Sequence, residues 1–282
     1  MPQIKKIFTV PALALTLASA APAIAAKPQI AESKPLFYAD VADVVSVAPV
    51  VAIATINNAQ WLRKELAVNV PAGRARLLVT ATVNALLRGD DGLPARIEYL
   101  IDVPLSPTNH PPKLRKLKVL IAASRVAGKP DMLRLVSAQA QLPWSPDAEA
   151  KARAILGEIV KPSAPPRIIG VGSAFHVKGS LPGESETQIF LKTDDERPVS
   201  LSILRRPGEQ PAFSVALGEM VDEAAPSPTP DTLLWYRLAC ALPESLPGTS
   251  VTDLSSEDAL AATLDYRFVI ARLGACQRTP HP

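Results

Sequence analysis

The sequence is poor in the residues and motifs from which most active sites are built. It has two cysteines and three histidines in 282 residues. The cysteines are not spaced as Cys-x-x-Cys, and no Gly-x-Ser-x-Gly string is present, which excludes a thioredoxin-type motif and the nucleophile elbow of α/β-hydrolases. Gly170-x-Gly172 lacks the third glycine of a dinucleotide loop, so we interpret these glycines as permitting close packing or a strand bulge. We therefore expect no cofactor, no metal and no catalytic set.

A long, uninterrupted hydrophobic segment is also lacking. The apolar stretch 41–56 is broken by Asp43 and Pro49, so we interpret it as a helix that leads into a strand. Neither sign of charge dominates, because 30 Lys and Arg face 27 Asp and Glu, and cleavage of a leader that contains Lys5 and Lys6 brings the mature chain close to neutrality. This balance gives no general reason to bind nucleic acid. We predict neither a nucleic-acid partner nor a transmembrane segment in the mature chain.

The N-terminal residues have the three-part composition of a secretory signal peptide. Two lysines precede an apolar run at 7–17 that is too short to span a bilayer, and small residues follow it. Ala-Ile-Ala at 23–25 fits a signal peptidase site, so we expect cleavage after residue 25 or 26. The sequence therefore predicts a signal peptide at 1–26 and a soluble mature protein that is periplasmic or secreted.

Export places Cys240 and Cys276 in an oxidising compartment, where an even number of cysteines favours a disulfide. The cysteines are 36 positions apart, which gives about 4 kcal/mol of stabilisation in the chain-entropy model. The alternative is a pair of buried free thiols.

Residues 27–160 are predicted to form a β-rich domain that ends in a helix. A short helix at 38–47 comes first, and apolar and polar residues then alternate with the period of two that is typical of strands. The turn strings at 88–92 and 128–131 separate successive strands. The expected strands are 50–56, 76–83, 96–103, 117–122 and 133–137. Five strands are enough to close a small barrel.

The order of these pieces resembles small exported domains with an OB-type barrel, of the kind seen in netrin and tissue-inhibitor-of-metalloproteinase modules. The matching strings are Ala-Asp-Val-Val at 42–45, Thr-Val-Asn-Ala-Leu-Leu-Arg-Gly at 82–89 and Val-Leu-Ile at 119–121. The resemblance covers about residues 39–142 and implies an OB-like barrel. The cysteines that staple those modules are missing, so their inhibitory or binding activities are not carried over.

A domain boundary is expected at the proline-rich segment 161–166, which follows a helix that begins at Ser145 and Pro146. Beyond it, residues 167–282 predict four antiparallel strands, with inward-facing residues at 169, 171, 175 and 177, then 189 and 191, then 199, 201 and 203, then 213, 215 and 217. Two helices follow, one capped by Asp231 and running to residue 242, the other running from Ser255 to Gly274 with an apolar stripe at 260, 264 and 268.

The predicted fold class is thus α+β and β-rich, with a small OB-like β-barrel followed by a four-stranded antiparallel meander packed with two helices. The part from 166 to 278 also resembles a family of uncharacterised exported bacterial proteins, through Gly-Glu-Ser-Glu-Thr-Gln at 183–188 and Leu-Trp-Tyr-Arg-Leu-Ala-Cys at 234–240. This resemblance implies no activity.

His176 is the histidine with a structured setting, because His110 lies in a proline-bracketed loop and His281 in the C-terminal tail. A hydrolase interpretation pairs it with a serine of the 179–187 loop or Ser173 and a carboxylate. A metal interpretation pairs it with Glu184 and Glu186 across a hairpin. A solvent-facing histidine at a strand end is the simpler alternative, which we favour.

Two basic clusters are further candidates. The string Lys-Leu-Arg-Lys-Leu-Lys at 113–118 could bind an anionic glycan or a membrane surface, although charges on an exposed strand also prevent edge-to-edge aggregation, which is the interpretation we favour. Arg205 and Arg206 at a hairpin tip could hold a carboxylate or phosphate, or lie in a solvated turn. The sequence favours a non-enzymatic binding or scaffolding protein of the cell envelope whose partner is an envelope protein or an anionic glycan. A hydrolase that uses His176 and the 179–187 loop is the alternative.

Overall fold

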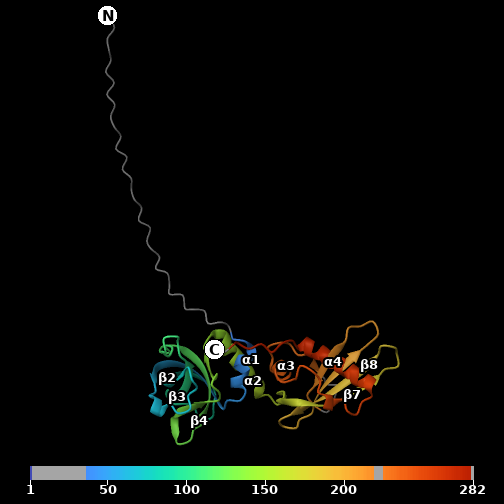
Figure 1. Ribbon diagram of the computed structural model, residues 1–282, viewed down its shortest axis with the longest axis horizontal. Coiled ribbons are helices and arrows are strands. Elements are labelled where there is room, and N and C mark those ends of the chain that lie inside the picture. The colour runs from blue at the N-terminus through green and yellow to red at the C-terminus, as the bar shows by residue number, and fades with distance from the viewer. Residues whose placement is uncertain (2–35, 219–224, 281–282) are drawn as a thin grey trace. The chain divides into compact units, whose positions relative to one another are not determined.

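The computed structural model describes Met1, residues 36–218 and residues 225–280 (Figure 1). Residues 2–26 of the predicted signal peptide, with the cleavage site, lie outside the described residues, as does His281. From Leu36 onward the described chain belongs to one compact unit. The predicted α+β class, a barrel followed by an antiparallel meander and helices, is confirmed.

The first part is a closed five-stranded barrel preceded by the helix α1 (Tyr38–Val45). Its strands are β1 (Val50–Trp61), β2 (Arg74–Arg88), β3 (Arg96–Pro104), β4 (Lys118–Val126) and β5 (Lys129–Leu135). They follow the order β1-β2-β3-β5-β4, and β4 pairs with β1 to close the circle. All pairs are antiparallel except β3 with β5, which is parallel. The short strand β6 (Gln141–Pro143) adds to β4, and the 3₁₀ turn η1 (Lys64–Leu66) lies between β1 and β2.

The period of two in the sequence does set the barrel interior. On β2 the buried residues Ala75, Leu77, Val79 and Ala81 alternate with more exposed neighbours, and Ile97, Tyr99, Ile101 and Val103 do the same on β3. The turn expected at 128–131 ends earlier than predicted, because β5 already begins at Lys129.

The helix α2 (Pro146–Ile159) begins as predicted, with the Ser145 side chain accepting a hydrogen bond from the Ala148 amide at 3.0 Å. The second part follows it. An antiparallel sheet contains β7 (Ile168–Lys178), β8 (Ser185–Thr193), β9 (Val199–Arg205), β10 (Ala212–Ala216) and the two-residue β11 (Ala225–Pro226). The helices α3 (Leu233–Ala239) and α4 (Ser256–Leu273) come next, with the 3₁₀ turn η3 (Gly248–Ser250) between them.

The inner face of β7 differs from the prediction. Of the four residues expected to share it, only Val171 is buried, whereas Ile169, Phe175 and Val177 are exposed. The pairing of β7 with β8 shifts register on both sides of Gly170–Val171, so the alternation is interrupted there. A Cβ at Gly172 would lie 3.1 Å from the Phe190 carbonyl oxygen, which confirms the expected close packing at Gly172.

The buried face of α4 also differs from the prediction. Leu260 and Leu264, two of the three stripe residues, are exposed. The helix instead buries a face rotated from that stripe, made of Ala262, Asp265, Tyr266, Val269 and Leu273. Both sets have helical spacing, and Asp265, the one charged residue of the second set, has hydrogen-bond partners on the sheet. The ends of α4 are as predicted, with Ser255 and Gly274 as caps.

The helix α3 is shorter than the predicted 231–242. Asp231 has a positive φ of 61° and does not cap it. The Thr232 side chain takes that role by accepting from the Trp235 amide at 3.3 Å. Cys240 follows the last helical residue and forms the predicted disulfide with Cys276, with the two Cα atoms 5.1 Å apart.

A large hydrophobic cluster contains residues from both sides of the predicted linker, while a second cluster fills the barrel. At the junction of α1 and α3 the Tyr236 hydroxyl donates to the Asp43 carboxylate at 2.7 Å, and Arg278 also pairs with Asp43 at 2.7 Å. Burial, together with the Asp43 carboxylate, raises the pKa of Tyr236 to about 12, so the phenol remains a donor at neutral pH. The boundaries at 160 and 167 stay a prediction.

Candidate functional site

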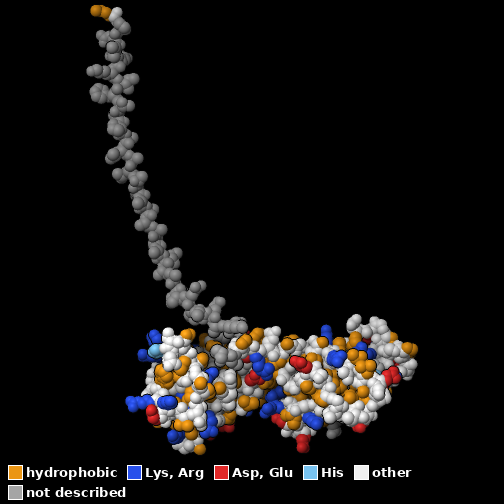
Figure 2. Space-filling model, viewed as in Figure 1, with side chains coloured by type: hydrophobic (Ala, Val, Ile, Leu, Met, Phe, Trp, Pro, Cys, Tyr) orange, Lys and Arg blue, Asp and Glu red, His pale blue; other side chains and the backbone are white. Residues whose placement is uncertain are grey.

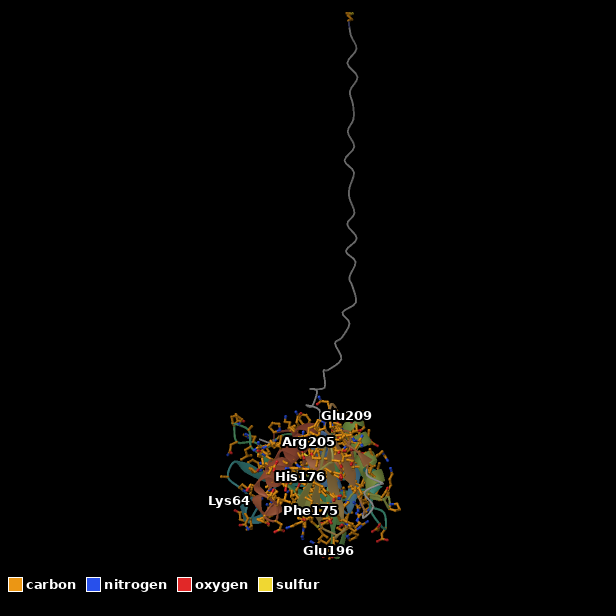
Figure 3. The ribbon with its side chains drawn as sticks, turned by 90° about the vertical axis from the view of Figure 1, so that its right-hand side faces the viewer. Lys64, Phe175, His176, Glu196, Arg205 and Glu209 are labelled. Atoms are coloured by element: carbon orange, nitrogen blue, oxygen red, sulfur yellow. A yellow bond between two sulfur atoms is a disulfide. The ribbon has the colours of Figure 1, made fainter. Side chains whose placement is uncertain are left out.

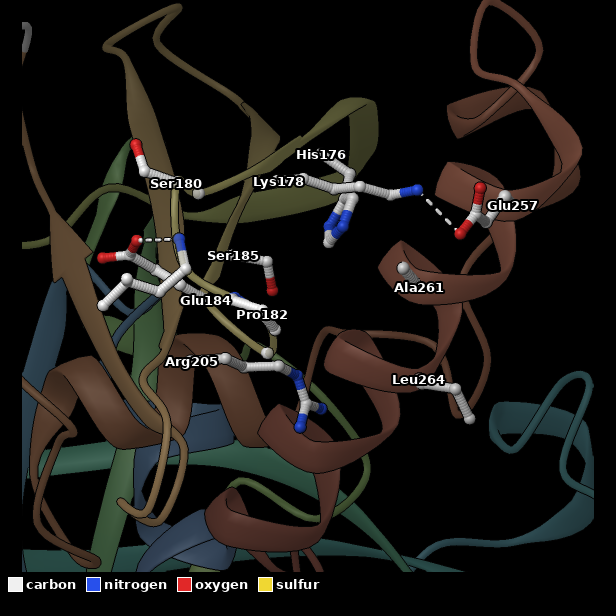
Figure 4. A pocket seen from close by; sticks show the side chains of 13 residues that line it. His176, Lys178, Ser180, Pro182, Glu184, Ser185, Arg205, Glu257, Ala261 and Leu264 are labelled. Carbon is white, nitrogen blue, oxygen red and sulfur yellow. Dashed lines mark hydrogen bonds and ion pairs between the residues drawn. The ribbon is translucent and has the colours of Figure 1, made fainter.

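A pocket of about 520 Å³ lies between the β7–β8 hairpin and α4 (Figure 4). Figure 3 is turned toward the sheet end of the molecule, where His176 and Arg205 are labelled. The apolar lining of the pocket comes from Leu181 and Pro182 of the hairpin loop and from Ala261 and Leu264 of α4. Its polar and charged lining residues are His176, Lys178, Ser180, Glu184, Ser185, Arg205 and Glu257. An apolar wall with a few converging polar groups is the usual composition of a small-molecule site.

The hairpin loop is held in shape by its own hydrogen bonds. The Gly179 amide donates to the Glu184 carbonyl at 2.8 Å, and the Glu184 amide donates to the Leu181 carbonyl at 2.9 Å. The Glu184 carboxylate accepts from the Leu181 amide at 3.3 Å, which places this carboxylate inside the loop. A Cβ on Gly179 would lie 2.3 Å from Cγ of Glu184, so a larger residue there would have to displace the Glu184 side chain.

Behind the pocket, four side chains from four elements form one polar network. The Nδ1 atom of His176 on β7 lies 2.8 Å from the Thr187 hydroxyl on β8. That hydroxyl donates a short hydrogen bond to the carboxylate of Asp265 on α4, which is 1% exposed. Arg205 on β9 donates from Nε to the same carboxylate at 2.5 Å. The buried charge is therefore paired and hydrogen-bonded, as a charge away from water must be.

The network fixes the proton on His176. The Asp265 carboxylate, paired with the Arg205 guanidinium, can only accept hydrogen bonds, so the single hydroxyl proton of Thr187 goes to it. The Thr187 oxygen must then accept from Nδ1 of His176. In the neutral imidazole the remaining nitrogen, Nε2, is consequently an acceptor. His176 lines the pocket, so Nε2 is the ring nitrogen left for a bound molecule.

The charges around the pocket are nearly balanced. Lys178 pairs with Glu257 at 2.7 Å, as the dashed line in Figure 4 marks, and this hydrogen bond raises the pKa of Lys178 above its ordinary value. Arg205 is paired with Asp265. Apart from His176, the remaining charged residue of the lining is Glu184. The site therefore offers no net positive field that would attract a phosphate or another strong anion.

The structure brings together three of the five residues that the sequence singled out for binding. His176, Glu184 and Arg205 line the pocket. Glu186 does not, because it accepts a hydrogen bond from Ser202 at 2.8 Å, and Arg206 is exposed with its closest carboxylate, Glu209, at 3.9 Å. His176 lies near the end of β7, as expected, and its ring is half-buried and hydrogen-bonded to Thr187.

The metal interpretation requires Glu184 and Glu186 to face His176 together, and they do not. Glu186 and Glu184 are engaged at separate places, so they do not converge with His176. Within residues 36–218 and 225–280, no group of three His, Cys, Asp or Glu side chains is arranged to hold a metal ion.

Sequence reasoning missed the residues that organise the site. Asp265 lies between buried apolar positions of α4, and a charged residue at such a position is the one signal that could have marked it. Thr187 gives no signal by itself, since threonine is common in strands. Its role depends on the helix that packs opposite.

The chain matches neither a protein-family model nor a curated protein in the comparisons made. The resemblances to exported OB-type modules and to an exported bacterial family therefore stay predictions. In the described part of the chain, every helix is too short or too polar to cross a membrane.

Proposed function

We propose that the protein is exported to the cell envelope and acts there, without catalysis, by binding a small uncharged or zwitterionic molecule in the pocket between the β7–β8 hairpin and α4. The observation that carries the proposal is the buried network from Asp265 to His176 and Arg205, which holds an acceptor and a donor at the wall of an open cavity.

The geometry supports binding because the polar groups are fixed before a ligand arrives. Asp265 and Thr187 are fully buried and hydrogen-bonded to each other, and they hold the side chains of His176 and Arg205 in place. These two side chains therefore lose little conformational entropy when a ligand binds. A ligand hydroxyl or ammonium can donate to Nε2 of His176, while a carbonyl or hydroxyl oxygen can accept from the guanidinium of Arg205. The apolar lining suits the rest of a small molecule.

A hydrolase is the second candidate, and one observation favours it. An imidazole whose Nδ1 is oriented by a side chain linked to a carboxylate is the arrangement of a general base. Ser180 and Ser185 line the same pocket. No hydrogen bond joins His176 to either serine in the described structure, so the nucleophile that this mechanism requires is not in place.

The test uses the full exported chain labelled with ¹³C-histidine. It is titrated with D-glucose as an uncharged probe, alanyl-alanine as a zwitterion and inorganic phosphate as an anion. We expect the His176 ring resonance to shift with glucose or alanyl-alanine and not with phosphate. Arg205→Ala should abolish the shift, and Arg206→Ala should retain it as a matched control. If neither glucose nor alanyl-alanine moves the resonance, the proposed ligand class is wrong.

Two further measurements separate the remaining parts of the proposal. Hydrolysis of p-nitrophenyl acetate that is lost in His176→Ala and in Ser185→Ala would establish the hydrolase instead. Fractionation of cells and N-terminal sequencing test export, and an intact Met1 on cytoplasmic protein would contradict the envelope location.

A further inference from the structure

Two loops that connect strands of the barrel meet at one end of the barrel. Neither loop contributes a residue to the pocket. The β1–β2 connection and the β3–β4 connection are joined by a hydrogen bond of 2.8 Å from the Leu105 amide to the Gly73 carbonyl. The second connection also contacts β1, through a 2.7 Å bond from the Lys116 amide to the Ile56 carbonyl. We call residues 61–74 and 105–118 together the barrel-end surface.

The barrel-end surface is strongly basic. It contains a single acidic residue, Glu65, and seven basic residues: Arg63, Lys64, Arg74, Lys113, Arg115, Lys116 and Lys118. The whole chain has 30 basic and 27 acidic residues, so outside this surface 23 basic residues face 26 acidic ones. The near-neutral composition therefore conceals a charge asymmetry. In Figure 2, Lys and Arg side chains project from the end of the molecule that carries β2 and β3 in Figure 1.

Most of these cations are free to meet a partner. Arg74 donates to the Asp102 carbonyl and Lys118 stacks on the Trp144 ring at 3.4 Å. The other five are exposed, and none of them forms an ion pair with a carboxylate of the described residues: Arg63, Lys64, Lys113, Arg115 and Lys116. Residues 113–117 precede β4 and are not part of a strand, so the predicted role of these charges in blocking an exposed strand edge is wrong.

Leu114 explains why three of the cations point outward together. It is buried in the barrel core, and it fixes the segment so that its neighbours Lys113, Arg115 and Lys116 are exposed. Lys116 adopts the left-handed conformation, with φ of 70°, at the tight turn that follows.

Exposed apolar side chains are interspersed with these charges. Leu66 is 68% exposed and Val68 is 63% exposed in the β1–β2 connection, and Trp61 at the end of β1 is 46% exposed. Leu117 is exposed in the other connection. The residues around Trp61 and Val68 also line a shallow groove of about 900 Å³. Apolar residues on a folded monomer normally do not gather in one patch, and a patch rimmed by cations marks an interaction surface.

We propose that the barrel-end surface docks onto the headgroup region of an anionic phospholipid bilayer. Five exposed cations, which form no ion pair with another described residue, match the negative potential of such a membrane. A bilayer favours Trp at the water–lipid interface and aliphatic side chains just beneath the headgroups, and the surface exposes both kinds of residue. An anionic glycan would match the cations alone and leave the apolar residues unexplained. The inference does not depend on the pocket or its ligand.

The test measures co-sedimentation of the full chain with vesicles of phosphatidylcholine, with and without phosphatidylglycerol. We expect binding only to vesicles that contain phosphatidylglycerol, weakened by added salt and accompanied by a blue shift of Trp61 emission that Trp61→Phe removes. The variant Lys113→Ser/Arg115→Ser/Lys116→Asn should lose about 100-fold in affinity, since each cation near the membrane contributes about fivefold. Asparagine is chosen at 116 because it tolerates the left-handed conformation.

Two controls keep the result specific. Lys129→Ser/Lys192→Ser/Arg206→Ser removes equal charge elsewhere on the described surface and should leave binding within about twofold, and an equal loss in this variant would refute the assigned surface. Leu66→Ser/Val68→Ser keeps every charge and should weaken vesicle binding.

If Leu66→Ser/Val68→Ser binds vesicles like the parent chain and the parent binds soluble heparin as tightly, the partner is an anionic glycan and the proposal is wrong. Absence of binding to phosphatidylglycerol vesicles by the parent chain also overturns it. Thermal unfolding of each variant shows that the fold persists, which we expect because all the replaced side chains are exposed.

Discussion

Arg205→Ala removes the only cation paired with the buried Asp265 carboxylate among the described residues, and its cost can be worked from the structure. Breaking a fully buried ion pair costs about 3–5 kcal/mol, because the remaining charge has lost both water and its partner. Here the Arg205 side chain is 36% exposed, so water can reach Asp265 after truncation, and the Thr187 hydrogen bond remains. We therefore expect a loss of about 2–3 kcal/mol in the free energy of unfolding.

The assay is urea unfolding at neutral pH, monitored by circular dichroism. A loss of this size lowers the unfolding midpoint by about 1 M if the denaturant slope is about 3 kcal/mol per molar. Arg206→Ala is the matched control, because Arg206 is exposed and lies 3.9 Å from the exposed Glu209. It should cost no more than about 0.5 kcal/mol.

A double-mutant cycle isolates the pair. Asp265→Ala and the double variant with Arg205→Ala complete it, and we expect a coupling free energy of about 2 kcal/mol between the two sites. The reasoning is refuted if Arg205→Ala and Arg206→Ala destabilise equally, or if the coupling is below about 0.5 kcal/mol. Either result would mean that Asp265 does not depend on Arg205, and the network would then lack the rigidity that the binding proposal requires.

Three other predictions follow from the remaining contacts. Cys240→Ser/Cys276→Ser should lose about 4 kcal/mol in urea unfolding, because the bond closes a loop with a separation of 36 residues, and a loss below about 1 kcal/mol would contradict this. Hydrogen bonds from the Trp144 indole and from Arg153 lower the pKa of Glu149, so this group contributes stability above its unfolded pKa that is lost as pH falls through its folded pKa. The measurement is Trp144 emission against pH in the parent chain, from which the curve of Glu149→Gln is subtracted. The midpoint of this difference should lie below the ordinary glutamate pKa, and a midpoint at or above that pKa would contradict the contact. Proteolytic cleavage within 160–167 should leave two fragments that elute together in native gel filtration, because the large hydrophobic cluster contains residues from both, whereas separate elution would show independent cores.

The candidate site shows how far sequence reasoning extends. His176 and Arg205 were identifiable because histidine is rare in this chain and paired arginines are conspicuous. Their connection was not, since it passes through Thr187 on another strand and Asp265 on a helix 78 residues further along the chain. Residues so distant in sequence become neighbours only through packing. No local pattern records that.

The sequence by itself determined the parts of the structure that depend on near neighbours. Alternation with a period of two specified β2 and β3, and Ser145, Ser255 and Gly274 specified helix ends, because the hydrogen bonds of a cap are made within a few residues. The disulfide was predictable from an even cysteine count in a chain expected to be exported.

Only the tertiary structure decided which of two helically spaced faces of α4 is buried. The sequence favoured Leu260 and Leu264, but burial of the opposite face satisfies Asp265 through the sheet. It also decided that β3 and β5 pair in parallel within the barrel and that two distant connections form one basic end. These outcomes depend on contacts between segments far apart in the chain, where the free energy of packing exceeds any local preference.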